Sequence, residues 1–411
     1  MIDLKKVRED IAGYKLICQK KGKHFDIDAI LALDDKRKAL QLEIDQTKAQ
    51  QKQLAAQKDY EGAKNLKIQI QELESQHTQV DTELKSWLLK MPNTALHPEV
   101  PEGKDDSENV VVQNFWTIPQ FDFQPLDHVE LMKKHDMIDI ERGVKLGGAR
   151  SYFLKGDGML LEQAVLQYTL KKIVERGFIP MQVPNIVNPE CLQGTGYFPG
   201  GEEDAYRMER DDQRLIGTSE IPVTAYHMNE ILNEDDLPKK YCGYSACYRR
   251  EAGTYGKDTA GLYRVHQFQK VEQVVVLPAD EKMSEQYYRQ ILQNSMDILA
   301  DLELPHRLLQ LCSGDLAIGK YNSHDLECRM PSRNAYGETH SVTAFLDFQA
   351  RRLNLKYRDK DGKIQYCYTM NNTAIATPRV LIAIIENNQT ADGKIRIPKV
   401  LQAYMGKEVI G

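Results

Sequence analysis

The chain has few of the patterns that mark disulfide-linked, zinc-binding or membrane-spanning proteins. Its seven cysteines are an odd number scattered over 411 residues, with no CxxC pair and no Cys/His group at the spacing of zinc ligands. This pattern predicts reduced thiols in an intracellular protein, and no zinc. No run of 18 uncharged apolar residues occurs, and the N-terminus "MIDLKKVRED" has no apolar core of a signal peptide. We therefore expect a soluble, cytoplasmic protein without membrane association.

The chain also lacks an excess of basic charge. Its formal net charge is -6 and its isoelectric point is near 6.0, which argues against a uniformly basic nucleic-acid-binding surface. A local basic patch could still bind a nucleic acid. At 411 residues the chain is longer than one compact domain of usual size, so two domains are expected.

Proline is absent from residues 30–91, and this stretch contains two series of mostly apolar residues at helical spacing. Steps of three and four residues are typical of a coiled coil, so the stretch predicts two long helices that reverse near Gly62. Each helix has a single narrow apolar seam, which the other helix buries, and an antiparallel protruding arm results. The first series holds Ile30, Leu33, Arg37, Leu40, Ile44, Thr47, Gln51 and Leu54, and the second holds Ala63, Leu66, Ile70, Leu73, His77, Val80, Leu84, Trp87 and Met91.

Charge is unevenly distributed along this arm. Residues 36–67 contain eight basic and four acidic side chains, a net of +4, whereas residues 72–83 contain four acids and no base. One interpretation is an ordinary solvated helical surface or a dimerising coiled coil. The other is a grip on a phosphate backbone, independent of sequence and sensitive to salt.

The composition changes near residue 100. The segment "KMPNTALHPEVPEGKDDSENV" contains three prolines and an acidic, polar end, which is typical of a linker. We place a domain boundary near Asp105, with a helical arm domain at 1–105 and a second domain at 106–411. In the second domain, segments such as "KVEQVVVLP", "LDFQARRLNLKYRD" and "IQYCYTM" predict strands. Strand runs outnumber crossover helices, so we expect an α+β fold in which an antiparallel sheet is flanked by helices.

The stretch "YRREAGTYGKDTAGLYRVHQFQKVE" concentrates charge and glycine. We expect "CYRREAG" on one strand, "TYGKDTAGL" as a loop and "YRVHQFQKVEQVVV" as the return strand. Alternation on the return strand puts Val265 on one face and five other side chains on the opposite face: Arg264, His266, Phe268, Lys270 and Glu272. An aromatic ring with arginines and an acid suits a ligand that has a flat base, phosphates and an amine. Taken singly, Phe268 could instead be a core residue and Glu272 an ordinary ion-pair partner.

This stretch closely resembles motif 2 of the seryl-tRNA synthetases, which are class II aminoacyl-tRNA synthetases. "GFIPMQVPNIVNPECL" is similar to their motif 1, and "TMNNTAIATPRVLIAIIENNQTADGKIRIPKVLQAYMG" is similar to their motif 3 and C-terminal signature. "LIGTSEIPVT" resembles their serine-binding segment, and the arm resembles their tRNA-binding domain. The resemblance covers essentially the full chain. It implies a serine–tRNA ligase, which activates L-serine with ATP to seryl-adenylate and then transfers serine to the 3′ end of tRNA(Ser).

The resemblance implies two catalytic arginines. Arg249 would contact the α-phosphate and the amino-acid carboxylate, and Arg379 would hold the γ-phosphate, because a guanidinium fork matches such oxygen groups. Phe268 would stack on the adenine. The full set implied for ATP is Arg249, Arg250, Glu251, Arg264, Val265, Phe268, Glu338, Thr339, His340, Ser341 and Arg379.

The family pattern also implies Mg2+ with ATP, held by Glu338 and Ser341 of "ETHS". His340 lies between them, but the family's matching position is not a base. A pocket that hydrogen-bonds the serine hydroxyl rejects alanine, because alanine leaves buried polar groups unpaired, and threonine must be excluded by shape. The residues implied for serine are Thr218, Ser219, Glu220, Arg249, Glu272, Asn371 and Thr373.

The resemblance further implies a homodimer. Motif 1 would help form the interface, and the arm of one subunit would present tRNA to the active site of the other. Whether tRNA(Sec) is also charged stays open. Two alternatives remain: a paralogue that delivers an amino acid to a carrier protein, and an inactive scaffold. The complete arm opposes the first, and the presence of Arg249 and Arg379 opposes the second.

One strand departs from the family pattern. Where the family usually has "REISSCSN", this chain has "GETHSVTA", so Gly337 replaces a common arginine, and Val342 and Thr343 replace a Cys-Ser pair. Glu338 and Ser341 are retained. Motif 3 reads "NNTAIATPR" rather than "NGSGLAVGR", which keeps a hydroxyl and the arginine.

Overall fold

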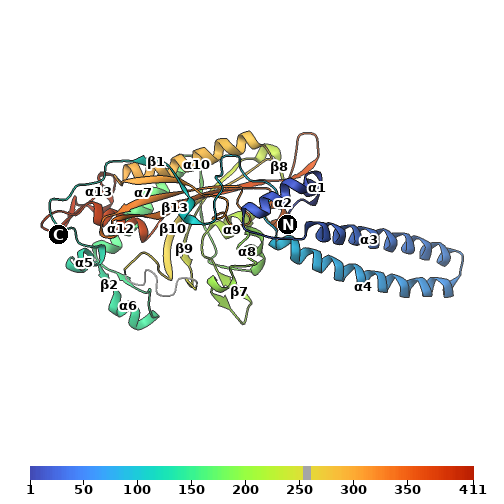
Figure 1. The fold of residues 1–411 in the computed structure, drawn as a ribbon. Coiled ribbons are helices and arrows are strands. Elements are labelled where there is room, and N and C mark those ends of the chain that lie inside the picture. Colours follow the sequence, from blue (N-terminus) through green and yellow to red (C-terminus); the bar gives the residue numbers. More distant parts are fainter. Residues whose placement is uncertain (253–260) are drawn as a thin grey trace. The chain divides into compact units, whose positions relative to one another are not determined.

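A computed structural model describes residues 1–252 and 261–411 of the chain (Figure 1). Its internal contacts divide it into two compact units, Met1–Ala95 and Leu96–Gly411. The boundary near Asp105 stays a prediction. Within the described ranges, every helix is too short or too polar to cross a lipid bilayer.

The first unit is entirely helical. Two short helices, α1 (Leu4–Glu9) and α2 (Ile11–Lys20), precede a hairpin of α3 (Ile27–Ala56) and α4 (Tyr60–Lys90). Each long helix begins at an aspartate cap: Asp26 accepts from the Ala29 N–H at 3.0 Å, and Asp59 accepts from the Gly62 N–H at 2.9 Å. At 30 and 31 residues the two helices are each about 45 Å long. Gly62 therefore lies in the first turn of α4, not between the helices as the sequence suggested.

The seam of the hairpin follows the apolar series along most of its length. Leu40 and Ile44 of α3 pack with Leu73 and Val80 of α4. Near the end of α4 the seam shifts by one residue: Leu88 is 6% exposed, whereas the ring of Trp87, which the heptad pattern placed inside, is 38% exposed. The antiparallel coiled-coil arm that the sequence predicted is confirmed.

The second unit is built on an eight-stranded sheet. Its strand order is β1-β11-β12-β13-β16-β10-β9-β4, and all neighbours are antiparallel except β4 and β9. The predicted α+β class with a mainly antiparallel sheet is confirmed. The strand bounds, in sheet order, are Val110–Phe115, His306–Gln310, Asn322–Met330, Ala335–Leu346, Tyr368–Ala376, Gln267–Leu277, Lys239–Tyr248 and Ile179–Gln182.

Helix α10 (Glu281–Asp301) covers one face of the sheet centre. Gln273 of β10 donates to the Ile291 carbonyl at 3.2 Å, and Asn372 of β16 donates to Ser295 at 2.8 Å. Because side chains alternate along a strand, Glu272 and Thr373 point to the opposite face. Strand β10 is also the apolar core of the sheet, since Val274 to Leu277 are fully buried.

The remaining elements surround this sheet (Figure 1). The other helices are α5 (His128–Lys134), α6 (Ile140–Gly147), α7 (Asp157–Glu175), α8 (Pro189–Thr195), α9 (Glu220–Thr224), α11 (Phe348–Leu353), α12 (Arg379–Asn387) and α13 (Lys399–Met405). The other strands are β2 (Ile138–Asp139), β3 (Phe153–Leu154), β5 (Ile186–Val187), β6 (Arg207–Met208), β7 (Gln213–Leu215), β8 (Ile231–Asn233), β14 (Lys356–Arg358), β15 (Ile364–Tyr366), β17 (Ile395–Arg396) and β18 (Val409–Ile410).

Two local predictions were wrong. The segment "LDFQARRLNLKYRD" is not one strand, because residues Phe348–Leu353 form α11 and only Lys356–Arg358 form a strand. A short apolar run does not distinguish a buried helix from a strand, and the Arg351 side chain holds the helical form by donating to Asp347 at 2.9 Å. The second error concerns motif 2, where β9 ends at Tyr248 and β10 begins only at Gln267. Most of the predicted loop "TYGKDTAGL" lies outside the described residues.

Candidate active site

A cavity lies where the ends of several sheet strands meet the start of α12. Its walls come from the end of β9, the segment before β10, β10 itself, β13 and β16. Ten of the eleven residues that the resemblance implies for ATP line this one cavity. The lining residues are Arg249, Glu251, Tyr263, Arg264, Val265, Phe268, Lys270, Glu338, Thr339, His340, Ser341, Thr373, Ala376, Thr377, Pro378 and Arg379.

Arg249 and Phe268 form one wall of this cavity. The guanidinium carbon of Arg249 lies 5.3 Å from the ring centroid of Phe268, within cation–π range, and its Nε donates to the Gly217 carbonyl at 3.3 Å. The second contact fixes the direction of the guanidinium. Beside this pair, Arg264 forms an ion pair with Glu251 at 3.2 Å. An arginine anchored on an aromatic ring can contact an anion without losing its position.

Arg379 and Glu338 form the opposite wall. Arg379 is the first residue of α12, and its Nη1 lies 3.1 Å from the Glu338 carboxylate, while its Nε donates to the Tyr263 carbonyl at 3.0 Å. Burial opposes ionisation of Glu338, but Arg379 and Arg249 hold its pKa below the ordinary value. The Tyr263 ring lies against the Arg379 guanidinium, 4.5 Å from ring centroid to guanidinium carbon.

The substituted glycine of β13 makes room for this tyrosine. A Cβ at Gly337 would lie 2.9 Å from Cε2 of Tyr263 and 2.8 Å from Cε of Met330. Any side chain at residue 337 would therefore displace Tyr263 or Met330. Strand β13 runs without interruption from Ala335 to Leu346, so the glycine does not break the strand that carries Glu338 and Ser341.

Buried polar groups lie together at the deep end of the site. Glu272 is 2% exposed, forms an ion pair with Lys270, and accepts a hydrogen bond from the Thr373 hydroxyl at 3.2 Å. Burial raises the pKa of the Glu272 carboxyl, although Lys270 acts against this rise. Glu220 at the start of α9 is held by the Tyr197 hydroxyl and by Gln349, each at 2.8 Å. Two oriented carboxylates in a buried pocket can bind an ammonium group and a hydroxyl.

Comparisons with known proteins agree along the whole length of the chain. The model of the seryl-tRNA synthetase N-terminal domain matches residues 1–95, and the model of the tRNA synthetase class II core domain (G, H, P, S and T) matches residues 206–388. The chain is 40% identical to the serine–tRNA ligase of Deinococcus radiodurans over 100% of this chain and 99% of the relative.

The chain belongs to the seryl-tRNA synthetase family. Two solved structures also superpose on it: the seryl-tRNA synthetase of Pyrococcus horikoshii complexed with ATP, at 33% identity, and the cytoplasmic serine–tRNA ligase of Naegleria fowleri in complex with AMP, at 29% identity. Their TM-scores are 0.92 and 0.90, covering 100% and 99% of this chain and 99% and 98% of those chains. The resemblance inferred from the sequence is confirmed, and the chain is a class II aminoacyl-tRNA synthetase.

The other residues that the resemblance implies for serine are buried. The Thr218 hydroxyl accepts from the Glu220 N–H at 3.2 Å, so Thr218 orients the start of α9. Ser219 donates to the Gly243 carbonyl at 3.2 Å and is fully buried. Asn371 is 7% exposed and lies two residues before Thr373 on β16, on the same side of the strand.

Some predicted placements differ in the structure. Arg250 does not line the cavity and instead donates to the Glu203 carbonyl at 2.9 Å. Val265 lines the cavity together with Phe268, where the resemblance put it, although strand alternation put the two on opposite faces. The segment before β10 is not a strand, so alternation does not apply to it. His266 turns away for the same reason: its Nδ1 lies 3.0 Å from the Arg249 carbonyl, and it lines a different cavity.

The surroundings of His340 favour the uncharged imidazole. It is 1% exposed, and burial lowers its pKa to about 3. Its Nε2 lies 3.0 Å from the Ala374 carbonyl, and its Nδ1 lies 2.8 Å from the Thr339 hydroxyl. Both ring nitrogens are therefore occupied: the Nδ1 contact stays within β13, and the Nε2 contact joins β13 to β16.

Sequence reasoning missed several residues of the site. Lys270 had been placed on the correct face but was given no role, and Tyr263, Tyr197 and Gln349 were not singled out. Asp325 of β12 was also missed. Its carboxyl lies beside Ser341 and Glu338, one oxygen has no hydrogen-bond partner, and burial together with Glu338 raises its pKa to about 7. These contacts join residues that are distant in sequence, so no local motif could have indicated them.

The few oxygen donors around Ser341 suit a hard cation. Within residues 1–252 and 261–411, no three His, Cys, Asp or Glu side chains gather as metal ligands. Glu338 and Asp325 offer carboxylate oxygens and Ser341 a hydroxyl, which are the ligand types that Mg2+ prefers. The unpartnered buried oxygen of Asp325 fits a site that a cation completes.

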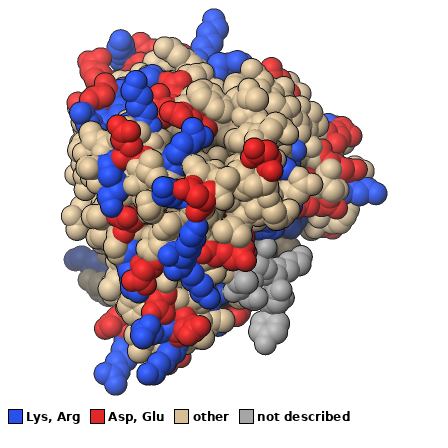
Figure 2. Space-filling model, turned by 90° about the vertical axis from the view of Figure 1, so that its left-hand side faces the viewer, with Lys and Arg blue, Asp and Glu red and all other residues tan. Residues whose placement is uncertain are grey.

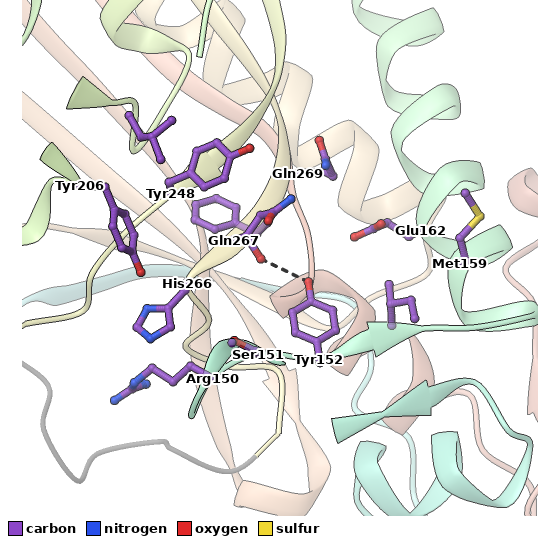
Figure 3. A pocket seen from close by; sticks show the side chains of 14 residues that line it. Arg150, Ser151, Tyr152, Met159, Glu162, Tyr206, Tyr248, His266, Gln267 and Gln269 are labelled. Atoms are coloured by element: carbon purple, nitrogen blue, oxygen red, sulfur yellow. Dashed lines mark hydrogen bonds between the residues drawn. The ribbon is translucent and has the colours of Figure 1, made fainter. Parts of the chain in front are cut away.

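A larger cavity of about 520 Å³ shares Phe268 with the first one (Figure 3). Figure 3 shows Arg150, Tyr152, Glu162 and His266 around it, and the Tyr152 hydroxyl donates to the Gln267 carbonyl at 3.4 Å. Arg249 and Arg379 line the other cavity, as do Lys270 and Thr373, which contact the buried Glu272. A hydrogen bond links the two cavities: Thr377, which lines the first, donates from its hydroxyl to Glu162 of the second at 2.7 Å.

Proposed function

We propose that this site activates L-serine with ATP and then transfers the seryl group to the 3′ end of tRNA(Ser). One arrangement carries the proposal: Arg249 and Arg379 line the same cavity, and Thr373 and Lys270 of its lining contact the buried Glu272. Two cations suit the phosphates, and a buried acid beside a hydroxyl suits a small hydroxylated amino acid. The relatives that this chain resembles are serine–tRNA ligases, which supports the same reaction.

In the first step the serine carboxylate attacks the α-phosphorus of ATP. A new P–O bond forms, the bond to the bridging oxygen breaks, and pyrophosphate leaves with the electron pair. An ionised carboxylate is already a nucleophile, so no protein base is needed. Arg249 stabilises the negative charge at the reacting phosphate, and Arg379 holds the leaving end, so positioning and charge neutralisation provide most of the acceleration. Phe268 supplies the flat surface for the adenine.

Serine selection depends on Glu272 and its neighbours. Glu272 binds the ammonium and the hydroxyl, and Thr373 orients it from β16. Alanine would leave these buried polar groups unpaired, and such a site can discriminate by about 10⁴-fold. Glu220, fixed by Tyr197 and Gln349, completes the pocket.

Mg2+ accompanies ATP in this proposal, with Glu338 and Ser341 as its protein ligands and Asp325 beside them. When bound, the cation would neutralise phosphate charge and orient the phosphate chain. The chain's own contribution is to hold Glu338 ionised next to Arg379. No zinc is proposed.

The helical arm binds tRNA in this proposal. Its turn-proximal half carries the net positive charge of residues 36–67, and A-form RNA is recognised mainly by shape and backbone. On the face of the second unit drawn in Figure 2, which carries the C-terminus, Lys and Arg are interspersed with Asp and Glu. That face has no large area of positive charge, so the arm is the better candidate for the long variable arm of tRNA(Ser). An aminoacylation assay can test whether tRNA(Sec) is charged as well as tRNA(Ser).

We infer a cytoplasmic homodimer joined near motif 1. Strand β4 of motif 1 is an edge strand, and the Ile179 side chain there is 56% exposed. Other large apolar side chains are also at least 44% exposed, namely Ile186 on β5 and Met159 and Leu160 on α7, and exposed apolar surface is typical of an interface. The seven free cysteines agree with a reducing compartment.

Aminoacylation assays with serine, threonine and alanine test the proposal directly. We expect serine-dependent exchange of pyrophosphate into ATP and charging of tRNA(Ser), with little response to alanine or threonine. Exchange without tRNA charging would instead favour the paralogue that loads a carrier protein. Loss of exchange in Arg249→Ala would support the site, and undiminished exchange in that variant would exclude it.

A further inference from the structure

Glu386 lies inside the second unit, away from the substrates, and connects three segments. It belongs to α12, the helix that Arg379 begins, and its side chain is 0% exposed. One carboxylate oxygen accepts from the Ser332 hydroxyl at 2.8 Å and from the His128 N–H at 3.1 Å, and the other accepts from the Ser332 N–H at 2.9 Å. Burial opposes its ionisation, but His128 and Ser332 hold its pKa below the ordinary value.

The His128 imidazole continues this network towards motif 2. Its Nδ1 lies 2.9 Å from Glu386, and its Nε2 accepts from the Leu262 N–H at 3.2 Å. Accepting at Nε2 requires the proton on Nδ1, which then donates to Glu386. The carboxylate thus selects the tautomer that can hold Leu262, as an acidic partner commonly does for a histidine.

The segment that His128 holds leads directly to the nucleotide site. A Cβ at Gly261, whose φ is +75°, would lie 2.4 Å from Nε2 of His128, so the backbone packs directly on the ring. Leu262 is fully buried, and the next residue is Tyr263, whose carbonyl accepts from Nε of Arg379 at 3.0 Å.

The second branch of the network ends at the same tyrosine. Ser332 lies in the turn between β12 and β13, next to Arg333, whose guanidinium carbon is 4.1 Å from the Tyr263 ring centroid. Arg379 lies 4.5 Å from that centroid, so both guanidinium groups are within cation–π range of one ring. The buried Glu386 side chain therefore orients three segments: helix α12 with Arg379, the segment that contains Tyr263, and the turn that contains Arg333.

We propose that Glu386 and His128 are positioning residues for ATP, which set the Arg379–Tyr263–Arg333 stack at the phosphate end of the site. Neither residue lines the cavity, and each acts through the backbone that it holds. Arg333 thereby places a further guanidinium against Tyr263, in a chain that has Gly337 where the family usually has an arginine. This proposal deepens the proposed function and rests on it.

Two conservative variants distinguish the two hydrogen bonds that the His128 ring makes, one with Glu386 and one with Leu262. In His128→Gln the amide oxygen can still accept from the Leu262 N–H, whereas in His128→Asn the amide can reach only Glu386. We expect His128→Asn to weaken ATP binding about tenfold, because a buried N–H loses its acceptor, and His128→Gln to weaken it less. Glu386→Gln should resemble His128→Asn, because an amide cannot accept from all the donors around it. Serine affinity should change less than twofold in each.

The readouts are the ATP and serine dissociation constants, measured by calorimetry on the full chain, and the thermal unfolding midpoint. His306→Asn is the matched control, since His306 is 1% exposed and its Nδ1 bonds the Leu304 carbonyl outside the network. It should lower the midpoint without a selective loss of ATP affinity. Less than threefold loss of ATP affinity in His128→Asn, or an equal loss for serine, would overturn the proposal. Absence of serine-dependent pyrophosphate exchange by the unmodified protein would instead count against the proposed function, while the ATP constants still test the network.

Discussion

The Thr373 hydroxyl donates to the Glu272 carboxylate at 3.2 Å, across neighbouring strands β16 and β10. The two residues are 101 positions apart in the sequence. Between Val271 and Glu272 the register of the two strands shifts, and Glu272 comes to lie opposite Thr373. An irregularity in one strand pair therefore creates the hydrogen bond that orients the acid of the serine site.

Replacing Thr373 by valine should weaken serine binding. The change removes a hydrogen bond to the charged, buried Glu272, whose same oxygen keeps Lys270 as a partner. A hydrogen bond to a charged group contributes about 1.5–3 kcal/mol, so the KM for serine should rise roughly tenfold or more. The KM for ATP should stay within twofold. Pyrophosphate exchange at varied serine measures both. Thr169→Val, at a buried threonine of α7, is the control, and an equal rise in that variant would refute the assigned role.

Arg379→Ala should lower kcat/KM for exchange by about 10²–10³-fold, because a fixed cation at the leaving phosphates is lost. Arg379→Lys should recover little of this, since the guanidinium uses Nε for Tyr263 and Nη1 for Glu338. Arg396→Ala, on strand β17, serves as the surface control. Full activity of Arg379→Lys would show that only a point charge is needed.

Neutralising the basic half of the arm should affect charging but not activation. We expect the triple variant Lys48→Gln, Lys52→Gln and Lys64→Gln to weaken tRNA binding and to reduce the salt dependence of log K by about two units. Pyrophosphate exchange should be unchanged. A charge-matched triple in the second unit, at the exposed Lys360, Lys363 and Lys394, separates the arm from overall charge. Equal losses in the two triples would contradict a dedicated arm.

Asp34 of α3 should stabilise the helical unit in a pH-dependent way. Its side chain is 3% exposed and is contacted by Arg8 and Arg37 at 3.0 Å and by Lys38 at 2.6 Å. Burial disfavours its charge, but the hydrogen bonds of these three cations hold its pKa at about 2, below the ordinary 3.8. A lowered pKa contributes stability that is full above pH 3.8 and is lost as the pH falls through 2.

We therefore expect Asp34→Asn to destabilise the arm by about 2 kcal/mol at pH 7, and by less as the pH falls below 4. Circular dichroism of the full chain during thermal unfolding measures this. Asp35→Asn is the neighbouring control, because the Asp35 side chain is 61% exposed although it also contacts Arg8. Equal destabilisation by both variants at pH 7 would place the effect in Arg8 rather than in Asp34.

Ile179→Asp should convert a dimer into a monomer, because it puts a charge into the apolar edge at β4. Sedimentation velocity gives the oligomeric state. Val112→Asp is the counterpart on β1, the other edge of the same sheet, where Val112 is 54% exposed. Dissociation by Val112→Asp alone would move the interface to the opposite edge.

The arm, the fold class and the grouping of the residues that the resemblance implies for ATP could all be predicted from residue patterns. A heptad seam acts locally, since each helix is amphipathic regardless of what surrounds it, and Ile30, Ile44, Ile70 and Leu84 are buried as the spacing predicted. The motif strings placed Arg249, Phe268, Glu338 and Arg379 correctly around one cavity, although they lie up to 130 residues apart.

The ends of the strands and the contacts between distant side chains could not be predicted in this way. Strand alternation was extended from Phe268 back to Arg264, but β10 starts at Gln267, so Val265 enters the cavity and His266 leaves it. The Glu272–Thr373 pair depends on a register shift, and the Glu386–His128 network joins segments 258 residues apart. Such contacts depend on the register of paired strands and on packing between distant segments, and local residue patterns carry no record of either.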